Sequence, residues 1–261
     1  MSEATQSPVA LTIAGSDPSG GAGLQADLKT FHRWGCYGAS VVTLLTVQNT
    51  LGVLAVESMP VELVLAQYRA VTDDFTVDAI KTGALGNADL ITAISTELAT
   101  QNASVIVDPV MISKHGDRLI EDDAVAALRE QLIPTATLIT PNRFEAETLS
   151  GIKIDSPKSL LRAANLLMAL GTDAVLIKAH FEDQNRNLLM LENDHITFQS
   201  PRIKTQSTHG SGCVLSAAIA AQLAHGSGLK QAVSDSLQWL QRTIATAPRI
   251  GRGFGPLNLL D

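Results

Sequence analysis

The sequence contains little cysteine and no long apolar run. Only Cys36 and Cys213 occur among its 261 residues, so it lacks the disulfide framework that is typical of small secreted domains. No apolar stretch is long enough to cross a bilayer. The beginning of the chain is acidic and interrupted by glycine, unlike a secretory signal. We therefore expect a cytoplasmic protein, with residues 1–8 as a flexible N-terminus.

Positive charge and aromatic side chains are also scarce. The chain has 19 Lys and Arg residues against 26 Asp and Glu residues, a net charge of −7, and only 4% of its residues are aromatic. The basic patch interleaved with aromatic rings that would bind nucleic acid is therefore absent from the sequence. What the chain does contain is 45% hydrophobic and 17% charged residues, a composition typical of a globular protein with a sizeable core.

Short apolar runs rich in Val and Ile alternate with longer runs of helical period. This alternation predicts an α/β fold, with a central and mostly parallel sheet flanked by helices. The expected strands cover residues 9–14, 39–47, 77–81, 105–110, 137–140 and 174–179, and the expected helices cover residues 24–34, 61–74, 88–99, 121–132, 157–170, 210–224 and 229–245. Two apolar runs around Asn193-Asp194, within residues 187–203, predict a hairpin and a mixed edge of the sheet. No linker or internal repeat divides the chain, so we expect a single domain over residues 1–261.

A first glycine-rich loop runs from Gly15 to Gly23, between an expected strand and an expected helix. Loops at this position border the ligand crevice of open α/β sheets. Glycine lets the backbone approach a ligand closely, although a plain turn that needs positive φ would also use it. The spacing matches neither of the common nucleotide-binding fingerprints. We favour a role in a ligand site.

A second glycine-rich loop, Thr208-His209-Gly210-Ser211-Gly212-Cys213, precedes a strongly apolar helix. The unpaired amides and the dipole of a helix N-terminus favour an anion such as a phosphoryl group. A thiol in the first turn of a helix has a lowered pKa, because the same dipole stabilises the thiolate. Cys213 is therefore a candidate base. The alternative is that it packs as a small hydrophobe.

Polar residues follow three further strands. Asp108 precedes Pro109 at the end of an apolar run, Asn142 and Glu145 follow the next strand, and Lys178 ends the strand after that. Oxygen ligands from two strand ends suit Mg²⁺, which takes one or two carboxylates, although each residue alone is more often a helix cap or a solvated acid. A lysine at the end of a buried strand is expected to meet an anion, such as a β- or γ-phosphate. A third glycine loop, residues 251–256, either covers the site or merely ends the fold.

Taken together, these motifs resemble one family. Residues 10–31 are similar, almost residue for residue, to the opening of the hydroxymethylpyrimidine/phosphomethylpyrimidine kinases of thiamine biosynthesis, in the ribokinase-like superfamily. Further similar segments are Val47-Gln48-Asn49-Thr50, Lys81-Thr82-Gly83, Asp108-Pro109-Val110-Met111, Thr140-Pro141-Asn142 with Glu145, and Thr208 to Cys213. The resemblance runs from about residue 9 to residue 256, with Ser211 in place of the usual threonine and Ala179-His180 in place of the usual glycines after Lys178.

The resemblance implies a single-domain kinase that uses ATP and Mg²⁺ to phosphorylate 4-amino-5-hydroxymethyl-2-methylpyrimidine and then its monophosphate. It also implies a homodimer, whereas the charge balance and the lack of a long apolar run argue against nucleic acid and membrane as partners. It assigns catalysis to Cys213, Gly210 and Gly212; substrate binding to Gln48, Gly15, Asp27 and Val110; nucleotide binding to Lys178, Asn142, Thr208 and Ser211; and the metal to Asp108 and Glu145. The rival hypotheses are a pyridoxal-type vitamin kinase, which would need a different polar partner than Gln48, and a non-catalytic pyrimidine-binding regulator.

Overall fold

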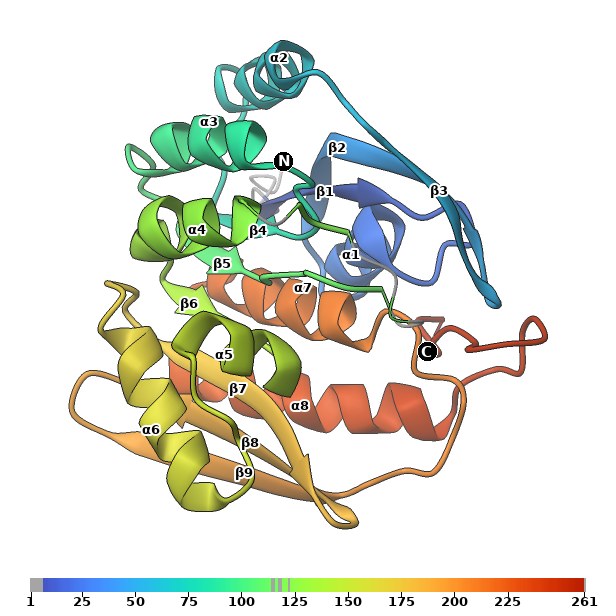
Figure 1. Cartoon of the computed structure of the whole chain (residues 1–261). Helices are drawn as coiled ribbons and strands as arrows, with labels where there is room; N and C mark the ends of the chain where they lie inside the picture. Colours follow the sequence, from blue (N-terminus) through green and yellow to red (C-terminus); the bar gives the residue numbers. More distant parts are fainter. Residues whose placement is uncertain (1–6, 114–115, 117–118, 122, 261) are drawn as a thin grey trace, which may run out of the picture.

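A nine-stranded sheet forms the centre of the computed structural model, which describes residues 7–113, 116, 119–121 and 123–260 (Figure 1). The strands lie in the order β3-β2-β1-β4-β5-β6-β7-β8-β9. Their bounds are β1 Val9–Ser16, β2 Tyr37–Asn49, β3 Gly52–Ser58, β4 Ala79–Thr82, β5 Ser104–Val107, β6 Leu138–Ile139, β7 Val175–Phe181, β8 Gln184–Met190 and β9 His195–Pro201. The prediction of a mostly parallel α/β sheet is confirmed.

Both edges of the sheet are antiparallel, whereas the strands from β2 through β1 to β7 pair in parallel. The predicted hairpin around Asn193-Asp194 is confirmed as β8 and β9. The other edge strand, β3, was not expected. Its side chains from Leu54 to Ser58 are exposed, so it shows none of the alternation between buried and exposed positions by which a half-buried strand is recognised.

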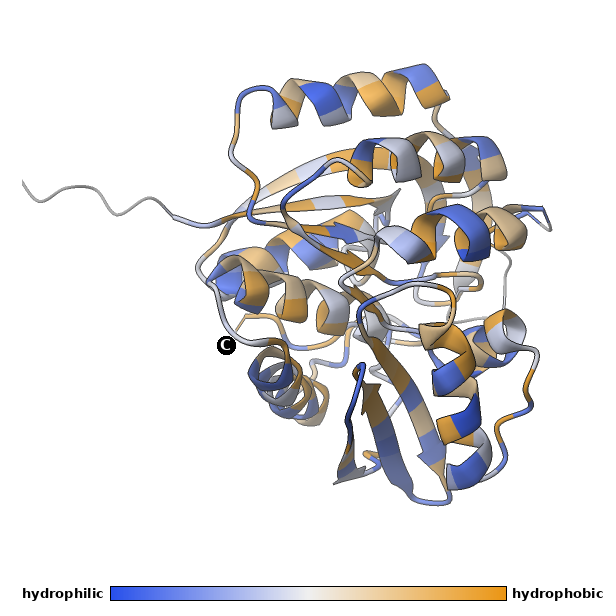
Figure 2. Ribbon diagram, turned by 90° about the vertical axis from the view of Figure 1, so that its left-hand side faces the viewer, coloured by the Kyte–Doolittle hydropathy of each residue, from blue (hydrophilic) through white to orange (hydrophobic). Residues whose placement is uncertain are grey.

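Helices cover both faces of the sheet. One layer contains α2 (Val61–Thr72), α3 (Ala88–Leu98), α4 (Ala124–Ala127), α5 (Arg143–Ser150) and α6 (Pro157–Met168), and the other contains α1 (Gly23–Arg33), α7 (Ser211–Ala224) and α8 (Leu229–Ala245). Figure 2 shows the hydrophobic strands between these layers, with hydrophilic residues on the outer sides of the helices. Within the described residues, no helix is long and apolar enough to span a membrane.

Two helical segments differ from expectation. The helix predicted over 121–132 is a short α4 that continues as a π-turn, Leu128–Leu132, and a 3₁₀ turn, Ile133–Thr135, because Pro134 cannot continue a helical hydrogen-bond ladder. Helix α5 was not predicted at all, although its capping box of Asn142 and Glu145 is readable in the sequence. Residues 1–6 of the expected flexible N-terminus lie outside the described residues.

The alternation of side chains along the strands brings several polar groups to one place. Ala10, Ala79 and Ile106 pack against α7. Side chains two residues further along a strand point to the same face. Thr12, Lys81 and Asp108 therefore lie on the face of the sheet that α1 and α7 cover. Thr140 and Lys178 lie on the same face, because each follows by two positions a residue, Leu138 or Leu176, that packs in this layer. The polar side chains thus collect under the first turn of α7.

Candidate active site

A cavity of about 1000 Å³ opens at the carboxyl ends of the parallel strands. This is the position at which open α/β sheets bind ligands, and its size is that of a substrate site. Every predicted site residue except Asp27 lines it: Gly15, Gln48, Asp108, Val110, Asn142, Glu145, Lys178, Thr208, Gly210, Ser211, Gly212 and Cys213. The structure thus brings together residues from Gly15 to Cys213, which lie near opposite ends of the sequence.

The first turn of α7 forms one wall of the cavity. Gly210 precedes the helix with a φ of 77°, and a Cβ atom there would stand 1.9 Å from the carbonyl oxygen of Gly21, so only glycine fits. The Gly210 carbonyl accepts the amide of Val214. No backbone acceptor within the described residues takes the amides of Gly212 and Cys213. Amides of this kind at a helix N-terminus are suited to bind an anion.

Cys213 lies in the first turn of α7, as predicted. The predicted lowering of its pKa is wrong for this structure. Burial raises the pKa of the Cys213 thiol to about 11, and the positive charge of Lys81 opposes this rise without cancelling it. The thiol is therefore protonated at neutral pH in the ligand-free protein.

Lys178 and Asp108 form an ion pair beneath the same turn, with Nζ 3.0 Å from Oδ1. The hydroxyls of Thr140 and Ser216 also donate to the Asp108 carboxylate. A Cβ atom on Gly212 would lie 3.3 Å from Lys178 Nζ. Although burial favours the neutral amine, Asp108 and Glu145 hold the pKa of Lys178 above its ordinary value. The ammonium therefore keeps its charge beside the place where the helix favours an anion.

Asn142 and Glu145 begin helix α5 and cap it reciprocally. The Asn142 amide donates to Glu145 Oε2 at 2.7 Å, and the Glu145 amide donates to Asn142 Oδ1 at 3.0 Å. Burial raises the pKa of Glu145 to about 7. The positive charge of Lys178 opposes this rise, and the negative charge of Asp108 adds to it. Two carboxylates that repel each other in one cavity suit a hard divalent cation. Groups of three or more candidate metal ligands were not found in the described part of the chain, so phosphate oxygens and water would complete such a site.

Asp27 lies behind the cavity wall. Its side chain is fully buried, and one carboxylate oxygen accepts hydrogen bonds from Lys81 Nζ at 2.7 Å and from the Thr12 hydroxyl at 2.6 Å. Contact with a substrate would require this wall to open. Lys81, which lines the cavity, was assigned no role from the sequence. The available signal was a lysine inside the short, apolar strand 79–82, where an uncompensated charge is costly.

Gln48 lines the same cavity as the first turn of α7 and lies on β2, where the pairing with β3 is irregular. The third glycine loop, residues 251–256, contacts the turn between β2 and β3, which follows Gln48. Phe254 donates its amide to the Thr50 carbonyl at 2.8 Å, and a Cβ atom on Gly253 would stand 1.9 Å from that same oxygen. The loop therefore does more than end the fold, because it holds the hairpin turn beside the cavity.

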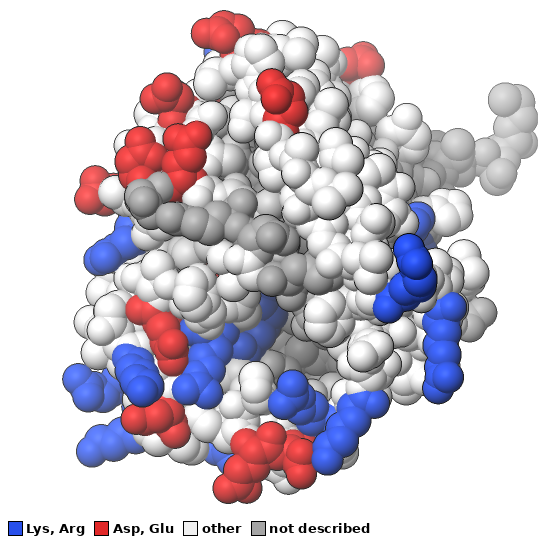
Figure 3. Space-filling model, turned by 45° about the vertical axis from the view of Figure 1, so that its right-hand side comes forward, with Lys and Arg blue, Asp and Glu red and all other residues white. Residues whose placement is uncertain are grey.

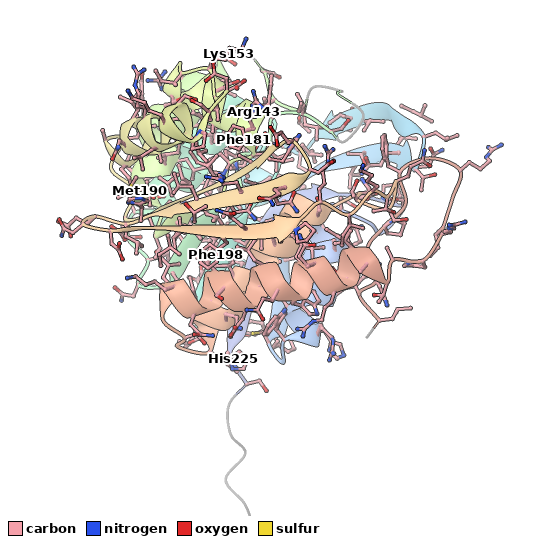
Figure 4. All side chains as sticks on the ribbon, turned by 90° about the horizontal axis from the view of Figure 1, so that it is seen from below. Arg143, Lys153, Phe181, Met190, Phe198 and His225 are labelled. Carbon is pink, nitrogen blue, oxygen red and sulfur yellow. The ribbon has the colours of Figure 1, made fainter. Side chains whose placement is uncertain are left out.

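Positive side chains gather on one side of the cavity. On the face shown in Figure 3, the Lys and Arg lie beside and below the hollow, with some Asp and Glu among them, and the upper part of this face carries Asp and Glu. Lys178, Arg143 and Arg202 are among the lining residues. Arg143 lies 6.0 Å from the centre of the Phe181 ring, and Phe198 packs against the α8 layer (Figure 4). Phe181 lies outside the cavity, but Phe198 lines it, so this side combines positive charge with an aromatic ring, as an anionic ligand with a flat ring requires.

The family model and the curated relatives point to one family, and the similar solved structures include both members of it and pyridoxal kinases. A family model described as phosphomethylpyrimidine kinase matches residues 17–258. A hydroxymethylpyrimidine/phosphomethylpyrimidine kinase of Rhizobium meliloti is 46% identical over 255 residues, covering 96% of each chain. A crystal structure of phosphomethylpyrimidine kinase from Clostridium difficile superposes with a TM-score of 0.81 at 39% identity, covering 90% of this chain and 99% of the other. An ADP complex of Bacillus subtilis pyridoxal kinase superposes with a TM-score of 0.89 at 35% identity, covering 97% of both.

Proposed function

The chain belongs to the phosphomethylpyrimidine kinase family, and we propose that it phosphorylates 4-amino-5-hydroxymethyl-2-methylpyrimidine and then the resulting monophosphate, using ATP. The observation that carries this proposal is the cavity in which Gln48 and the first turn of α7 face the same space. An amide side chain has an acceptor and a donor, which complement the edge of an aminopyrimidine. The amides of Gly212 and Cys213 are suited to the phosphoryl group in transfer.

In the first reaction the hydroxymethyl oxygen attacks the γ-phosphorus of ATP. A new O–P bond forms, the bond from the γ-phosphorus to the bridging oxygen breaks, and ADP leaves. The alcohol proton moves to the Cys213 sulfur, which must be in its thiolate form, and then to solvent. Lys178 and the α7 amides balance the negative charge of the transferred group, which is the main catalytic contribution in a loose phosphoryl transfer.

In the second reaction the nucleophile is a phosphate oxygen of the monophosphate. The second pKa of a phosphate monoester is about 6, so this oxygen carries no proton at neutral pH. A base is therefore unnecessary for this step. Cys213 would therefore be needed as a base in the first reaction but not in the second.

Asp108 and Glu145 are the residues that would hold Mg²⁺, because they are the two carboxylates that line the cavity near Lys178. The ion supplies positive charge to the phosphate oxygens. The ADP complex of the Bacillus subtilis relative supports nucleotide binding in this fold. We place Thr208, Ser211 and Asn142 on the nucleotide side, and Gly15 and Val110 on the pyrimidine side.

The rival substrate is pyridoxal, because solved pyridoxal kinases share this fold. We favour the pyrimidine because the family model and the Rhizobium relative both name it. The test incubates the purified protein with ATP and Mg²⁺ and either the aminopyrimidine alcohol, its monophosphate or pyridoxal, and measures products by mass spectrometry. We expect mono- and diphosphate from the pyrimidine. Turnover of pyridoxal alone would overturn the proposal.

A homodimer and a cytoplasmic location are part of the same proposal. Leu45, Val47, Leu54 and Val56 expose apolar side chains on both faces of the edge formed by β2 and β3, and such exposed apolar surface is suited to bind a second copy of the chain. ATP is supplied inside the cell, which favours the cytoplasm. Sedimentation of the wild-type protein and of Leu54→Glu tests the dimer, since a monomeric wild type would contradict it.

A further inference from the structure

We propose that Lys81, held by the Asp27 carboxylate, which also accepts the Thr12 hydroxyl, is a positioning residue that supplies the positive charge needed for Cys213 to act as a base. The inference rests on the proposed function and adds to it Lys81, which lines the substrate cavity, and its partner Asp27, which lies behind the cavity wall. Lys81 acts through the sulfur rather than by touching the phosphate.

The first argument is the burial of the pair. Lys81 and Asp27 both have fully buried side chains, and their charged atoms are 2.7 Å apart. Removing two charges from water costs several kcal/mol per ion, and apolar residues often stabilise such a place equally well. The pair is therefore poor evidence of a stability device, and its position has to be explained by something else.

The second argument is the direction of the lysine side chain. A Cβ atom on Gly83 would lie 2.9 Å from Lys81 Nζ and 3.0 Å from the Cβ atom of Ala14. Gly83 follows Lys81 by two positions toward the cavity and lines it, as do Ala14 and Lys81 itself. The ammonium therefore extends along β4 toward the carboxyl end of the sheet, where α7 begins.

The third argument concerns the charges that face the Cys213 sulfur from each packed element. Lys81 on β4 favours the thiolate, whereas Asp27 on α1 and Asp108 after β5 oppose it. Lys178 on β7 is also influenced by a Cys213 charge, but Asp108 and Glu145 act on it more strongly. Among these groups, Lys81 gives the sulfur its electrostatic support. Like Lys178, it is itself influenced by two carboxylates, Asp27 and Asp108.

Asp27 fixes the ammonium but also limits its effect. One carboxylate oxygen of Asp27 accepts both hydrogen bonds, and its other oxygen has no partner within the described residues. The charge of Asp27 partly cancels that of Lys81 at the sulfur. Removing the two charges one at a time should therefore shift the acidity of the Cys213 thiol in opposite directions. A pair with a purely structural role would not cause opposite shifts.

The experiment measures Cys213 alkylation by iodoacetamide as a function of pH, without substrate, in a Cys36→Ser background where Cys213 is the sole thiol. A neighbouring charge shifts a pKa by about 1–3, so we expect alkylation at pH 8 to slow about tenfold in Lys81→Met and to accelerate in Asp27→Asn. Lys153→Met, a substitution of an exposed lysine far from the cavity (Figure 4), is the matched control. Equal alkylation rates in all folded variants would overturn the inference.

A single variant leaves one buried charge unpaired and can unfold for that reason. The double variant Lys81→Met/Asp27→Asn removes both charges and keeps an acceptor for Thr12. We expect its alkylation to be slower than that of the wild type, and its first phosphorylation to lose at least about tenfold more than its second. Equal loss of both reactions marks a structural role and overturns the inference. Because alkylation needs no substrate, a failure of the proposed kinase activity would be recognised separately.

Discussion

His209 Nε2 lies 2.8 Å from Asp17 Oδ2, and this buried contact joins the first glycine loop to the loop that opens α7. Asp17 also accepts the backbone amides of Ser19 and Ala22, both at 2.8 Å. Although burial opposes ionisation, the bonds from His209 and Ser19 hold the pKa of Asp17 below its ordinary value of 3.8. One carboxylate thus orders the two loops that border the cavity.

Asp17→Asn should lower the free energy of unfolding of the protein. An amide has one acceptor oxygen, so at least one buried donor loses its partner, at a cost of about 1–3 kcal/mol in the free energy of unfolding. Urea unfolding at pH 7 measures this. Because the native pKa is depressed, the stabilisation is present above about pH 3.8 and is lost as the pH falls through the native pKa, so the two proteins should converge in acid. Ser19→Ala, which keeps the backbone donor, is the control.

Gln48→Met tests the pyrimidine side of the cavity. Methionine is close in size but leaves the polar edge of the ring unpaired, at a cost of about 1–3 kcal/mol. Pyrimidine affinity should fall about 5- to 150-fold by calorimetry, while nucleotide affinity stays unchanged. Gln101→Met makes the same exchange outside the cavity and should alter neither. Loss of nucleotide binding alone in Gln48→Met would contradict the assignment of this residue.

Glu145→Gln should change how stability depends on pH in the metal-free protein. With a native pKa of about 7 against an ordinary 4.5, the folded protein holds a proton that the unfolded chain has already released between these values. Stability should therefore fall as the pH rises from 4.5 to 7. Glutamine keeps the capping box and should remove this contribution, as measured by thermal unfolding across that range. Glu130→Gln, at an exposed carboxylate, should leave the slope intact.

The sequence predicts the central strands well because the residue types within each run are enough to favour a strand. Runs such as Val105-Ile106-Val107 are too short and too β-branched for a helix, and the structure buries them on both sides. β3 escaped prediction because its side chains face solvent, so its place depends on pairing with β2 rather than on its own pattern. Most motif residues meet in one cavity because they follow parallel strands or begin helices. Lys178 is an exception, because β7 continues to Phe181 instead of ending at the lysine as predicted.

The charge state of Cys213 could not be predicted in the same way. The sequence identifies the helix that begins beside the thiol, and this favours a lowered pKa. It does not identify how completely the thiol is enclosed, nor that Asp27 and Asp108 both face it. These are contacts between elements far apart in the sequence. The role of Lys81 could not be predicted for the same reason, because its partner Asp27 lies 54 residues away.

The prediction that depends most on the mechanism concerns Cys213→Ala. Only the first phosphorylation has a proton to remove, because the monophosphate is already ionised at neutral pH. The substitution should therefore slow phosphorylation of the alcohol about 10²- to 10⁴-fold, and that of the monophosphate much less, since the backbone amide of residue 213 remains. Rates with each substrate, at saturating ATP, measure the difference.

The dependence of these rates on pH provides the control. With a thiol pKa of about 11, the thiolate fraction rises about tenfold per pH unit between pH 7 and 9, and the wild-type rate on the alcohol should follow it while chemistry is limiting. Cys213→Ala should show no such rise, and Cys213→Asp should lose it because a carboxylate is already ionised there. If Cys213→Ala kept more than about a tenth of the wild-type rate on the alcohol, the loss would be too small for a base. The amides of α7 and Lys178 would then carry both reactions through a loose transition state, with the thiol serving only to pack.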